Sequence, residues 1–288
     1  MRGIFTALMT SFTENGEINE EGLREIVRHN LDQCQVDGLY VNGSTGENFM
    51  ISTQEKKQIF KIVKDEVGEK AKLIAQIGSI NIKEAIELAN YATDLGYDAI
   101  SAVTPFYYQF DFDEIYDYYN TIINSVDNKM IIYSIPALTG VNINLEQFGK
   151  LFENEKIIGV KFTAPDFFLL ERIRHRFPNK IIYSGFDEMF LSAAVLNVDG
   201  AIGSTFNING QRAKQIFQLA QNGKIEEARA IQKTTNDLIS EVLDNGLYQT
   251  LKGILQYKGV DAGYCRKPLK SLTDNQKKKA EEIAEEYL

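Results

Sequence analysis

The chain has few of the residues that cross-link a fold or bind metals. Its two cysteines, Cys34 and Cys265, are too few for a disulfide framework, and with His29 and His175 they show no metal-ligand spacing. No apolar run approaches the roughly 20 residues that span a bilayer. The apolar stretch within Met1–Thr10 is too short for a signal peptide and is interpreted as a first strand. We therefore expect a cytosolic, cytoplasmic globular protein that binds neither a metal nor a membrane.

Basic residues are in the minority and are not gathered in one place. The chain of 288 residues has 31 Lys and Arg against 40 Asp and Glu, which gives a formal net charge of −9. Without a concentrated basic patch to neutralise phosphates, nucleic-acid binding is not expected. The length is compatible with a single large domain, since α/β barrels of about 250 residues form one unit.

Apolar, β-branched segments recur along the chain, and each is followed by a stretch with helical periodicity. This pattern is typical of successive βα units and a parallel sheet. Eight such units that close on themselves predict an α/β fold, a (β/α)8 TIM barrel. The expected strands are Ile4–Leu8, Gly38–Val41, Leu73–Ile77, Ala99–Val103, Met130–Ser134, Ile157–Thr163, Ile181–Ser184 and Gly200–Gly203.

Helices are expected between the strands and after the last of them. Asn19–Gly22 and Ser52–Glu55 look like capped first turns, with acidic residues near the positive end of the helix dipole. Beyond the eighth strand, Ile225–Ile231 and Asp274–Leu288 have helical patterns. We divide the chain into a barrel, residues 1–222, and a C-terminal helical extension, residues 223–288. Because no Ser/Gly linker separates them, the extension is expected to pack on the barrel within a single structural unit.

Lys161 is the most informative position, because it is a lone lysine in the short apolar run Ile157–Thr163. In a strand, residues 159, 161 and 163 share one face, and the apolar residues 158, 160 and 162 share the other. The apolar face of a parallel barrel contacts the outer helices, so the amine is expected to point inward. Burial disfavours the charged form, and a neutral amine can form a Schiff base with a carbonyl substrate. The alternative is a strand-end lysine whose head reaches solvent.

Polar residues follow other strands at the same end of the barrel, where residues of this fold act chemically. Tyr133 is expected beside Lys161, as a proton-transfer group or as a barrel tyrosine with a satisfied hydroxyl. The loop Gly43–Glu47 offers hydroxyls and amides that fit a carboxylate, although such clusters are ordinary turns about as often. Two acids in Gly185–Glu188 suit a hydroxyl-rich ligand or a solvated loop. Gly203–Thr205 adds hydroxyls but lacks basic residues for phosphate.

Four motifs in this order and spacing carry a family resemblance: Gly43-Ser44-Thr45-Gly46-Glu47, Tyr133-Ser134-Ile135-Pro136, Gly159-Val160-Lys161 and Gly185-Phe186-Asp187-Glu188. Together they resemble the dihydrodipicolinate synthase/N-acetylneuraminate lyase superfamily of class I pyruvate aldolases, over essentially the whole chain. Dihydrodipicolinate synthases carry an arginine after the Tyr-x-x-Pro turn, where this chain has Leu138. The acidic pair Asp187-Glu188 and Thr163 match the sialic-acid branch, whereas Ser134 departs from the asparagine often seen after the tyrosine.

The resemblance implies a Schiff-base lyase that cleaves N-acetylneuraminate reversibly to N-acetylmannosamine and pyruvate without a cofactor. It implies that Lys161 forms the Schiff base and that Tyr133, aided by Ser44, transfers protons. Tyr107 looks like the residue that relatives insert into a neighbouring subunit, which implies a homotetramer, a dimer of dimers; ordinary interface or core packing is the alternative. The implied substrate-binding residues are Ser44, Thr45, Thr163, Gly185, Asp187, Glu188 and Ser204.

Two other functions stay open at this stage. One is a related pyruvate-dependent aldolase, such as dihydrodipicolinate synthase or a keto-deoxy sugar acid aldolase. Leu138 and the pair Asp187-Glu188 argue against it. The other is a non-catalytic barrel that binds sialic acid or pyruvate. Lys161, Tyr133 and the Ser44-Thr45 loop together argue against this, because a binding protein gains nothing obvious from an imine-forming amine.

Overall fold

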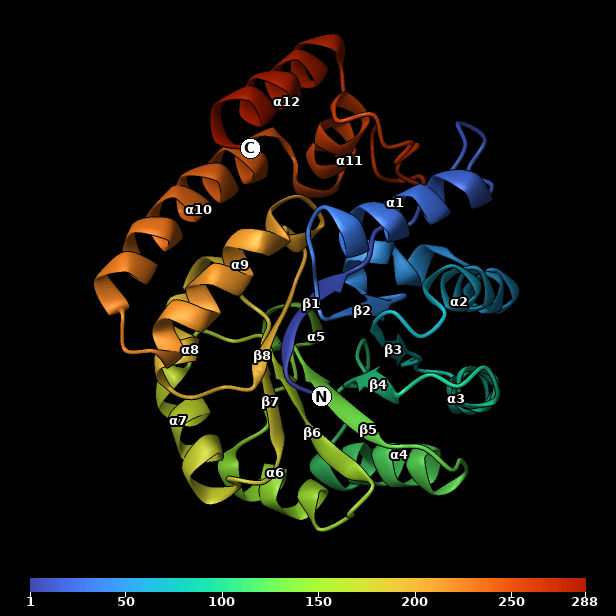
Figure 1. Ribbon diagram of the computed structural model, residues 1–288. Coiled ribbons are helices and arrows are strands. Elements are labelled where there is room, and N and C mark those ends of the chain that lie inside the picture. The colour runs from blue at the N-terminus through green and yellow to red at the C-terminus, as the bar shows by residue number, and fades with distance from the viewer.

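The computed structural model describes all residues, 1–288, and contains a closed barrel of eight parallel strands. Each strand bonds to the next in sequence, and the last bonds to the first (Figure 1). The predicted TIM barrel is thereby confirmed, and three strands differ from their expected bounds by one residue. The strands are β1 (Gly3–Ala7), β2 (Gly38–Val41), β3 (Lys72–Gln76), β4 (Ala99–Val103), β5 (Met130–Ser134), β6 (Ile157–Phe162), β7 (Ile181–Ser184) and β8 (Gly200–Gly203).

Helices surround the barrel (Figure 1). The two predicted capped turns are confirmed: the Asn19 side chain accepts from the backbone amide of Gly22, and Ser52 forms a capping box with Glu55. The helices of the barrel are α1 (Glu20–Asp32), α2 (Thr53–Val67), α3 (Ile82–Asp94), α4 (Phe112–Asn124), α5 (Pro136–Thr139), α6 (Leu145–Phe152), α7 (Phe167–Arg176), α8 (Phe190–Val195) and α9 (Phe206–Gln221), with short 3-10 helices η1 (Ser44–Gly46), η2 (Asn48–Met50) and η3 (Asp187–Met189).

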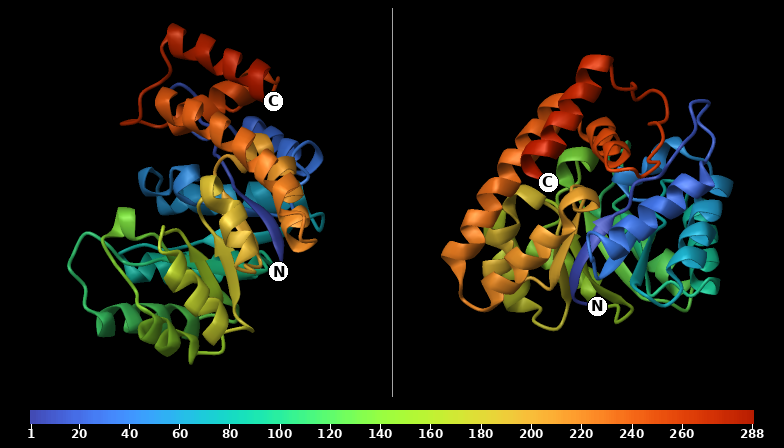
Figure 2. Two further views of the ribbon diagram at one scale, coloured as in Figure 1. Left: turned by 90° about the vertical axis from the view of Figure 1, so that its left-hand side faces the viewer. Right: turned by 45° about the horizontal axis from the view of Figure 1, so that its top comes forward.

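Three further helices follow the barrel: α10 (Ile225–Asn245), α11 (Leu247–Tyr257) and α12 (Asp274–Tyr287). The two predicted helical runs lie in α10 and α12. Figure 2 shows the three helices packed together on one side of the barrel, and α10 contacts both α9 and α12. The division proposed at residue 222 falls in the turn between α9 and α10. The extension therefore packs on the barrel through α10 and α9.

The apolar core has two layers. The larger one lies between the strands and the outer helices, and the smaller one fills the barrel interior. Aromatic rings dominate the interior: Phe5 meets Tyr183 edge to face with centroids 5.2 Å apart, and Tyr40 meets Tyr133 at 5.9 Å. Such pairs contribute about 0.5–1.5 kcal/mol beyond the area they bury. The barrel is thus a packed core rather than a pore.

One expectation about β6 is wrong. Ile158 packs against the interior layer and not against the outer helices, whereas Val160 and Phe162 belong to the outer layer as predicted. The pairing with β5 shifts at this point, from Met130 opposite Ile157 to Ile131 opposite Gly159. This irregularity adds one residue to β6 and breaks the two-residue alternation. Beyond it the alternation resumes, so the inward direction expected for the lysine is unaffected.

Three further observations concern possible cross-links, metals and membranes. Cys34 and Cys265 are both free thiols. No cluster of three or more His, Cys, Asp or Glu side chains is close enough to hold a metal ion. None of the helices combines the length and the apolar character that a membrane span requires.

Candidate active site

A cavity of about 200 Å³ opens at the carboxyl ends of the strands, where residues of this fold act chemically. Strand ends, the loops that follow them and two C-terminal helices all contribute to its wall. Every predicted site residue except Tyr107 lines this cavity. The residues that it brings together are Ser44, Thr45, Tyr133, Lys161, Thr163, Gly185, Asp187, Glu188 and Ser204.

Lys161 lies inside the barrel with 4% of its surface exposed, and its amine faces the cavity. Tyr133 is its register partner on the neighbouring strand, as the sequence predicted. The lysine Nζ lies 4.0 Å from the centroid of the Tyr133 ring and 4.7 Å from that of Tyr40. Two aromatic faces therefore fix the direction of the amine, and the phenol of Tyr133 reaches the same cavity.

The loop after β2 forms the 3-10 turn η1. The amide of Gly46 donates to the carbonyl of Gly43, and the amide of Glu47 donates to the carbonyl of Ser44. The amides of Ser44 and Thr45 begin the turn, so they have no partner within it. Their hydroxyls lie at the cavity wall. Amides and hydroxyls that converge in this way can hold a carboxylate, and we call residues 44–45 the carboxylate cradle.

The loops after β2 and β8 meet across the cavity. The hydroxyl oxygens of Thr45 and Ser204 are 2.7 Å apart, so one donates to the other. The cradle is thereby joined to the residues expected to contact the sugar.

Asp187 is buried and is held by the loop after β8. One of its carboxylate oxygens accepts from the backbone amide of Thr205 at 2.8 Å and from the Thr205 hydroxyl at 2.7 Å. Burial raises the pKa of Asp187 to about 6, and the hydrogen bonds from Thr205 only partly oppose that effect. Side chains of α10 fix the backbone nearby: Gln232 donates to the carbonyl of Asp187 and Asn236 to that of Glu188, both at 3.1 Å.

Two glycines leave room for the functional groups beside them. A Cβ on Gly185 would lie 1.8 Å from Oγ1 of Thr163, and a Cβ on Gly203 would lie 2.2 Å from a carboxylate oxygen of Asp187. The Thr163 hydroxyl is buried and has no hydrogen-bond partner in the protein. Buried polar groups normally have a partner, so this unpaired hydroxyl departs from the usual pattern.

Sequence analysis missed a substantial part of the wall. Leu138 was singled out, and it stands at the rim with 67% of its surface exposed. The residues from the C-terminal helices were not predicted, because in the sequence they have the apolar character of ordinary buried helix positions. Their side chains give the cavity an apolar side. They are Ile239 and Leu243 of α10 and Leu247 and Tyr248 of α11.

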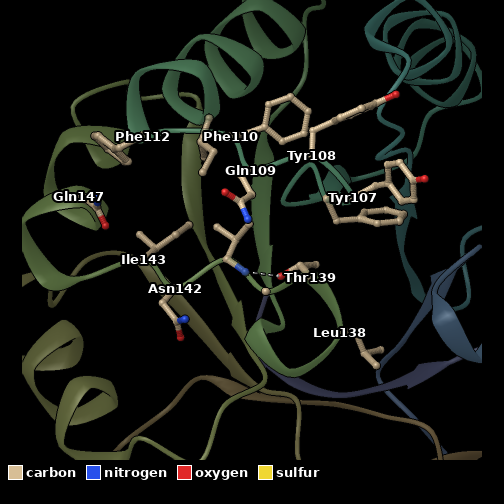
Figure 3. Close-up of a pocket in the computed structure, with 14 residues that line it drawn as sticks. Tyr107, Tyr108, Gln109, Phe110, Phe112, Leu138, Thr139, Asn142, Ile143 and Gln147 are labelled. Carbon is tan, nitrogen blue, oxygen red and sulfur yellow. Dashed lines mark hydrogen bonds between the residues drawn. The ribbon is translucent and has the colours of Figure 1, made fainter.

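Tyr107 lies outside this cavity. It lines a neighbouring hollow of about 700 Å³, between the loop after β4 and the segment after α5 (Figure 3). Its side chain is 83% exposed, and its φ of 81° lies in the left-handed region. Tyr108 stacks edge to face on it, with ring centroids 5.1 Å apart. Leu138 lines both spaces, so the hollow adjoins the rim of the cavity.

The fold and this arrangement of groups define a barrel enzyme with a buried lysine, and comparisons with known proteins agree. The chain belongs to the dihydrodipicolinate synthetase family, whose model matches residues 1–287. It is 67% identical to the N-acetylneuraminate lyase of Clostridium perfringens (strain SM101 / Type A), over the full length of both chains.

Solved structures give the same picture. The structure of CdNal from Clostridium difficile in complex with mannosamine is 68% identical, covers 100% of this chain and 99% of its own, and superposes with a TM-score of 0.99. N-acetylneuraminate lyase from Fusobacterium nucleatum complexed with pyruvate is 64% identical, with 100% and 97% covered and a TM-score of 0.96.

Proposed function

We propose that the protein is a Schiff-base lyase that cleaves N-acetylneuraminate reversibly to N-acetylmannosamine and pyruvate. The observation that carries the proposal is the meeting, in one cavity, of Lys161, Tyr133, the carboxylate cradle and the acidic pair after β7. The full-length relatives named N-acetylneuraminate lyase support the same activity. Two similar structures were solved with mannosamine and with pyruvate, which resemble the two products of the proposed reaction.

In the proposed mechanism, the amine of Lys161 attacks the C2 ketone of the open-chain sugar acid, and water leaves as the protonated imine forms. The imine accepts the electron pair of the C3–C4 bond. Tyr133, aided by Ser44, takes the proton from the C4 hydroxyl, and N-acetylmannosamine departs as the aldehyde. The enamine left on Lys161 is protonated at C3, and water hydrolyses the resulting imine to pyruvate and the free amine.

The remaining groups would bind and orient the substrate. The hydroxyls and amides of Ser44 and Thr45 hold the carboxylate, and preorganised dipoles of this kind stabilise charge at little reorganisation cost. Thr163 contacts the middle hydroxyls of the sugar. The acidic pair binds the polyol tail, together with Ser204 and the carbonyl of Gly185. In Asp187 the oxygen not held by Thr205 is the one available to the sugar.

The proposed reaction proceeds through a covalent lysine intermediate and uses no cofactor or metal. Leu138 at the rim favours the sugar acid over the carboxylate-bearing aldehyde of dihydrodipicolinate synthases, because an alkyl side chain offers no charge to a second carboxylate. The cytoplasmic location expected from the sequence belongs to this proposal as well.

We also propose that the enzyme is a homotetramer in which Tyr107 contributes to the site of a neighbouring subunit. Two observations support this. The ring is exposed on its own chain and lies at a hollow that adjoins the cavity rim. The left-handed backbone of Tyr107 costs of order 1–3 kcal/mol in a residue other than glycine, and such strain is typical of functional positions.

The decisive experiment is mass spectrometry of the intact protein after borohydride reduction in the presence of N-acetylneuraminate. Pyruvate serves as a control, and release of N-acetylmannosamine is assayed in parallel without reductant. We expect a pyruvate-sized adduct on Lys161 and release of the sugar. An adduct from pyruvate alone would favour another aldolase of the family, and the absence of any adduct would refute the Schiff-base mechanism.

A further inference from the structure

Glu47 ends the turn that contains the carboxylate cradle, and its side chain is fully buried. Its backbone lies in the left-handed region, with φ of 63°, and its amide closes the turn on the carbonyl of Ser44. The side chain is 0% exposed and does not line the catalytic cavity. A buried carboxylate needs an ionic partner and hydrogen bonds on both oxygens.

Both oxygens of Glu47 have partners from the C-terminal part of the chain. One accepts from Nζ of Lys252 on α11 at 2.8 Å, and the other accepts from the backbone amide of Arg266 at 2.7 Å. The Lys252 side chain is only 3% exposed. Its amine also donates to the carbonyl of Tyr264 and lies 5.0 Å from the centroid of the Phe12 ring. The cradle loop, α11 and the segment 264–266 therefore meet at one buried carboxylate.

Lys252 lies one helical turn after Tyr248, so the two side chains share a face of α11. Tyr248 lines the catalytic cavity together with Ser44. The ion pair thus fixes α11 against the cradle loop and, with it, the position of Tyr248 in the cavity wall.

We infer that Glu47 and Lys252 are positioning residues for pyruvate binding: their ion pair holds the carboxylate cradle and α11 in a fixed position relative to each other. Neither residue touches the substrate. The pair acts through Ser44 and Thr45 and through the cavity wall that α11 supplies. This inference rests on the proposed function, since it assigns the cradle to the carboxylate of pyruvate.

The chain contains a matched control. Lys56 on α2 forms an ion pair with Glu84 on α3 at 2.9 Å, and their side chains are 5% and 18% exposed. Neither residue lines the cavity. Removal of either lysine leaves a poorly solvated carboxylate, so Lys56→Met and Lys252→Met should both lower the melting temperature. Only the second should disturb the cradle.

The test compares the two variants with the wild type in the synthesis direction, with pyruvate and N-acetylmannosamine. We expect Lys252→Met to raise KM for pyruvate about tenfold or more, with a much smaller change in KM for N-acetylmannosamine. Lys56→Met should leave both constants near the wild-type values. Hydrogen exchange of peptides that cover residues 43–50 should become faster in Lys252→Met only. Equal KM values and equal exchange in the two variants would overturn the inference.

A second variant covers the case in which Lys252→Met does not fold. The double variant Glu47→Gln/Lys252→Met removes both charges together, which is tolerated far better than the loss of one. We expect it to fold with a raised KM for pyruvate, and a wild-type KM would refute the positioning role. If wild-type protein forms no pyruvate adduct, the proposed function fails. The exchange measurement still decides whether the ion pair orders residues 43–50.

Discussion

Tyr133 and Lys161 are direct register partners on β5 and β6, and the lysine amine lies 4.0 Å from the centre of the tyrosine ring. The ring contact and the phenol hydroxyl therefore have separate tasks. The ring helps to direct the amine, whereas the hydroxyl is the group proposed for proton transfer in the cavity that Tyr133 lines. A substitution that keeps the ring and removes the hydroxyl should separate them.

Tyr133→Phe should form the pyruvate adduct but cleave N-acetylneuraminate slowly. The phenylalanine ring preserves the contact with Lys161, while the loss of a positioned acid–base group lowers kcat by roughly 10²–10⁴-fold. Borohydride trapping and steady-state kinetics measure the two properties independently. Lys161→Arg is the control and should give no adduct. A Tyr133→Phe enzyme with full kcat would exclude the proton-transfer role.

Replacement of Asp187 and Glu188 by alanine should impair sugar handling while imine formation with pyruvate remains. Both residues line the cavity from the loop after β7, and the cradle is on the loop after β2. We expect KM for N-acetylneuraminate to rise about tenfold or more, since each lost hydrogen bond to a charged group is worth about 1.5–3 kcal/mol. Simultaneous loss of the pyruvate adduct would contradict this division of labour.

Asp187 should make folding stability depend on pH in the acidic range. Burial raises its pKa from the ordinary 3.8 to about 6, so the folded state holds a proton that the unfolded state has released. Its stabilising contribution is therefore complete below about pH 4 and is lost as the pH rises through 6. The loss amounts to about 3 kcal/mol at most.

The comparison of wild type with Asp187→Asn isolates this contribution. Asparagine does not titrate, so the difference in melting temperature between the two proteins should change between pH 4 and 7 in favour of the variant. A difference that is constant over this range would show that Asp187 is not buried as a protonated acid.

Gly185→Ala should reduce both stability and turnover of the sugar acid, because the new Cβ would overlap Oγ1 of Thr163. Thermal melts should show a loss of about 1–3 kcal/mol, typical of overpacking. In the double variant Thr163→Ala/Gly185→Ala the contact of 1.8 Å disappears, while the two Cβ atoms remain 2.8 Å apart, so stability should recover only in part. Additive effects of the two substitutions would mean that they do not share this contact.

Tyr107→Phe tests the assignment across subunits. If the hydroxyl acts in a neighbouring site, kcat should fall without a change in oligomer size, measured by sedimentation velocity. Tyr107→Gly relieves the left-handed backbone and removes the ring, and it should weaken the oligomer if the ring packs between subunits. Kinetics and oligomer size that are both unchanged in the two variants would remove the role of Tyr107.

Strand positions and the direction of Lys161 could be predicted because both depend on local patterns. Apolar segments that alternate with stretches of helical periodicity define the βα units. In a six-residue strand whose other residues are apolar or glycine, the lysine can face only the helices or the barrel interior. Ile158 was misplaced because its direction depends on the pairing of β6 with β5. A register shift in that pairing is not encoded in the alternation of a single strand.

The part of the cavity wall that comes from α10 and α11 could not be predicted for a related reason. Tyr248 reaches the site only because α11 folds back over the barrel, and the ion pair that fixes α11 joins residues 205 positions apart. In the sequence Thr205 is only a further hydroxyl at the end of the eighth strand, whereas in the structure its partner is the carboxylate of Asp187, which no local pattern indicates. Contacts over such sequence distances require the tertiary structure.

The close approach of Gly185 to Thr163 restricts how a new specificity could evolve in this barrel. A Cβ at 185 would lie 1.8 Å from Oγ1 and 2.8 Å from Cβ of Thr163, so a larger residue there requires both a smaller side chain at 163 and a shift of the neighbouring atoms. A lineage that first shortens position 163 loses the contact proposed between Thr163 and the sugar before it gains space beside β7. An enzyme with a larger residue at 185 is therefore reached only through an intermediate that binds the sugar less well. Single substitutions at these positions should seldom change the range of substrates.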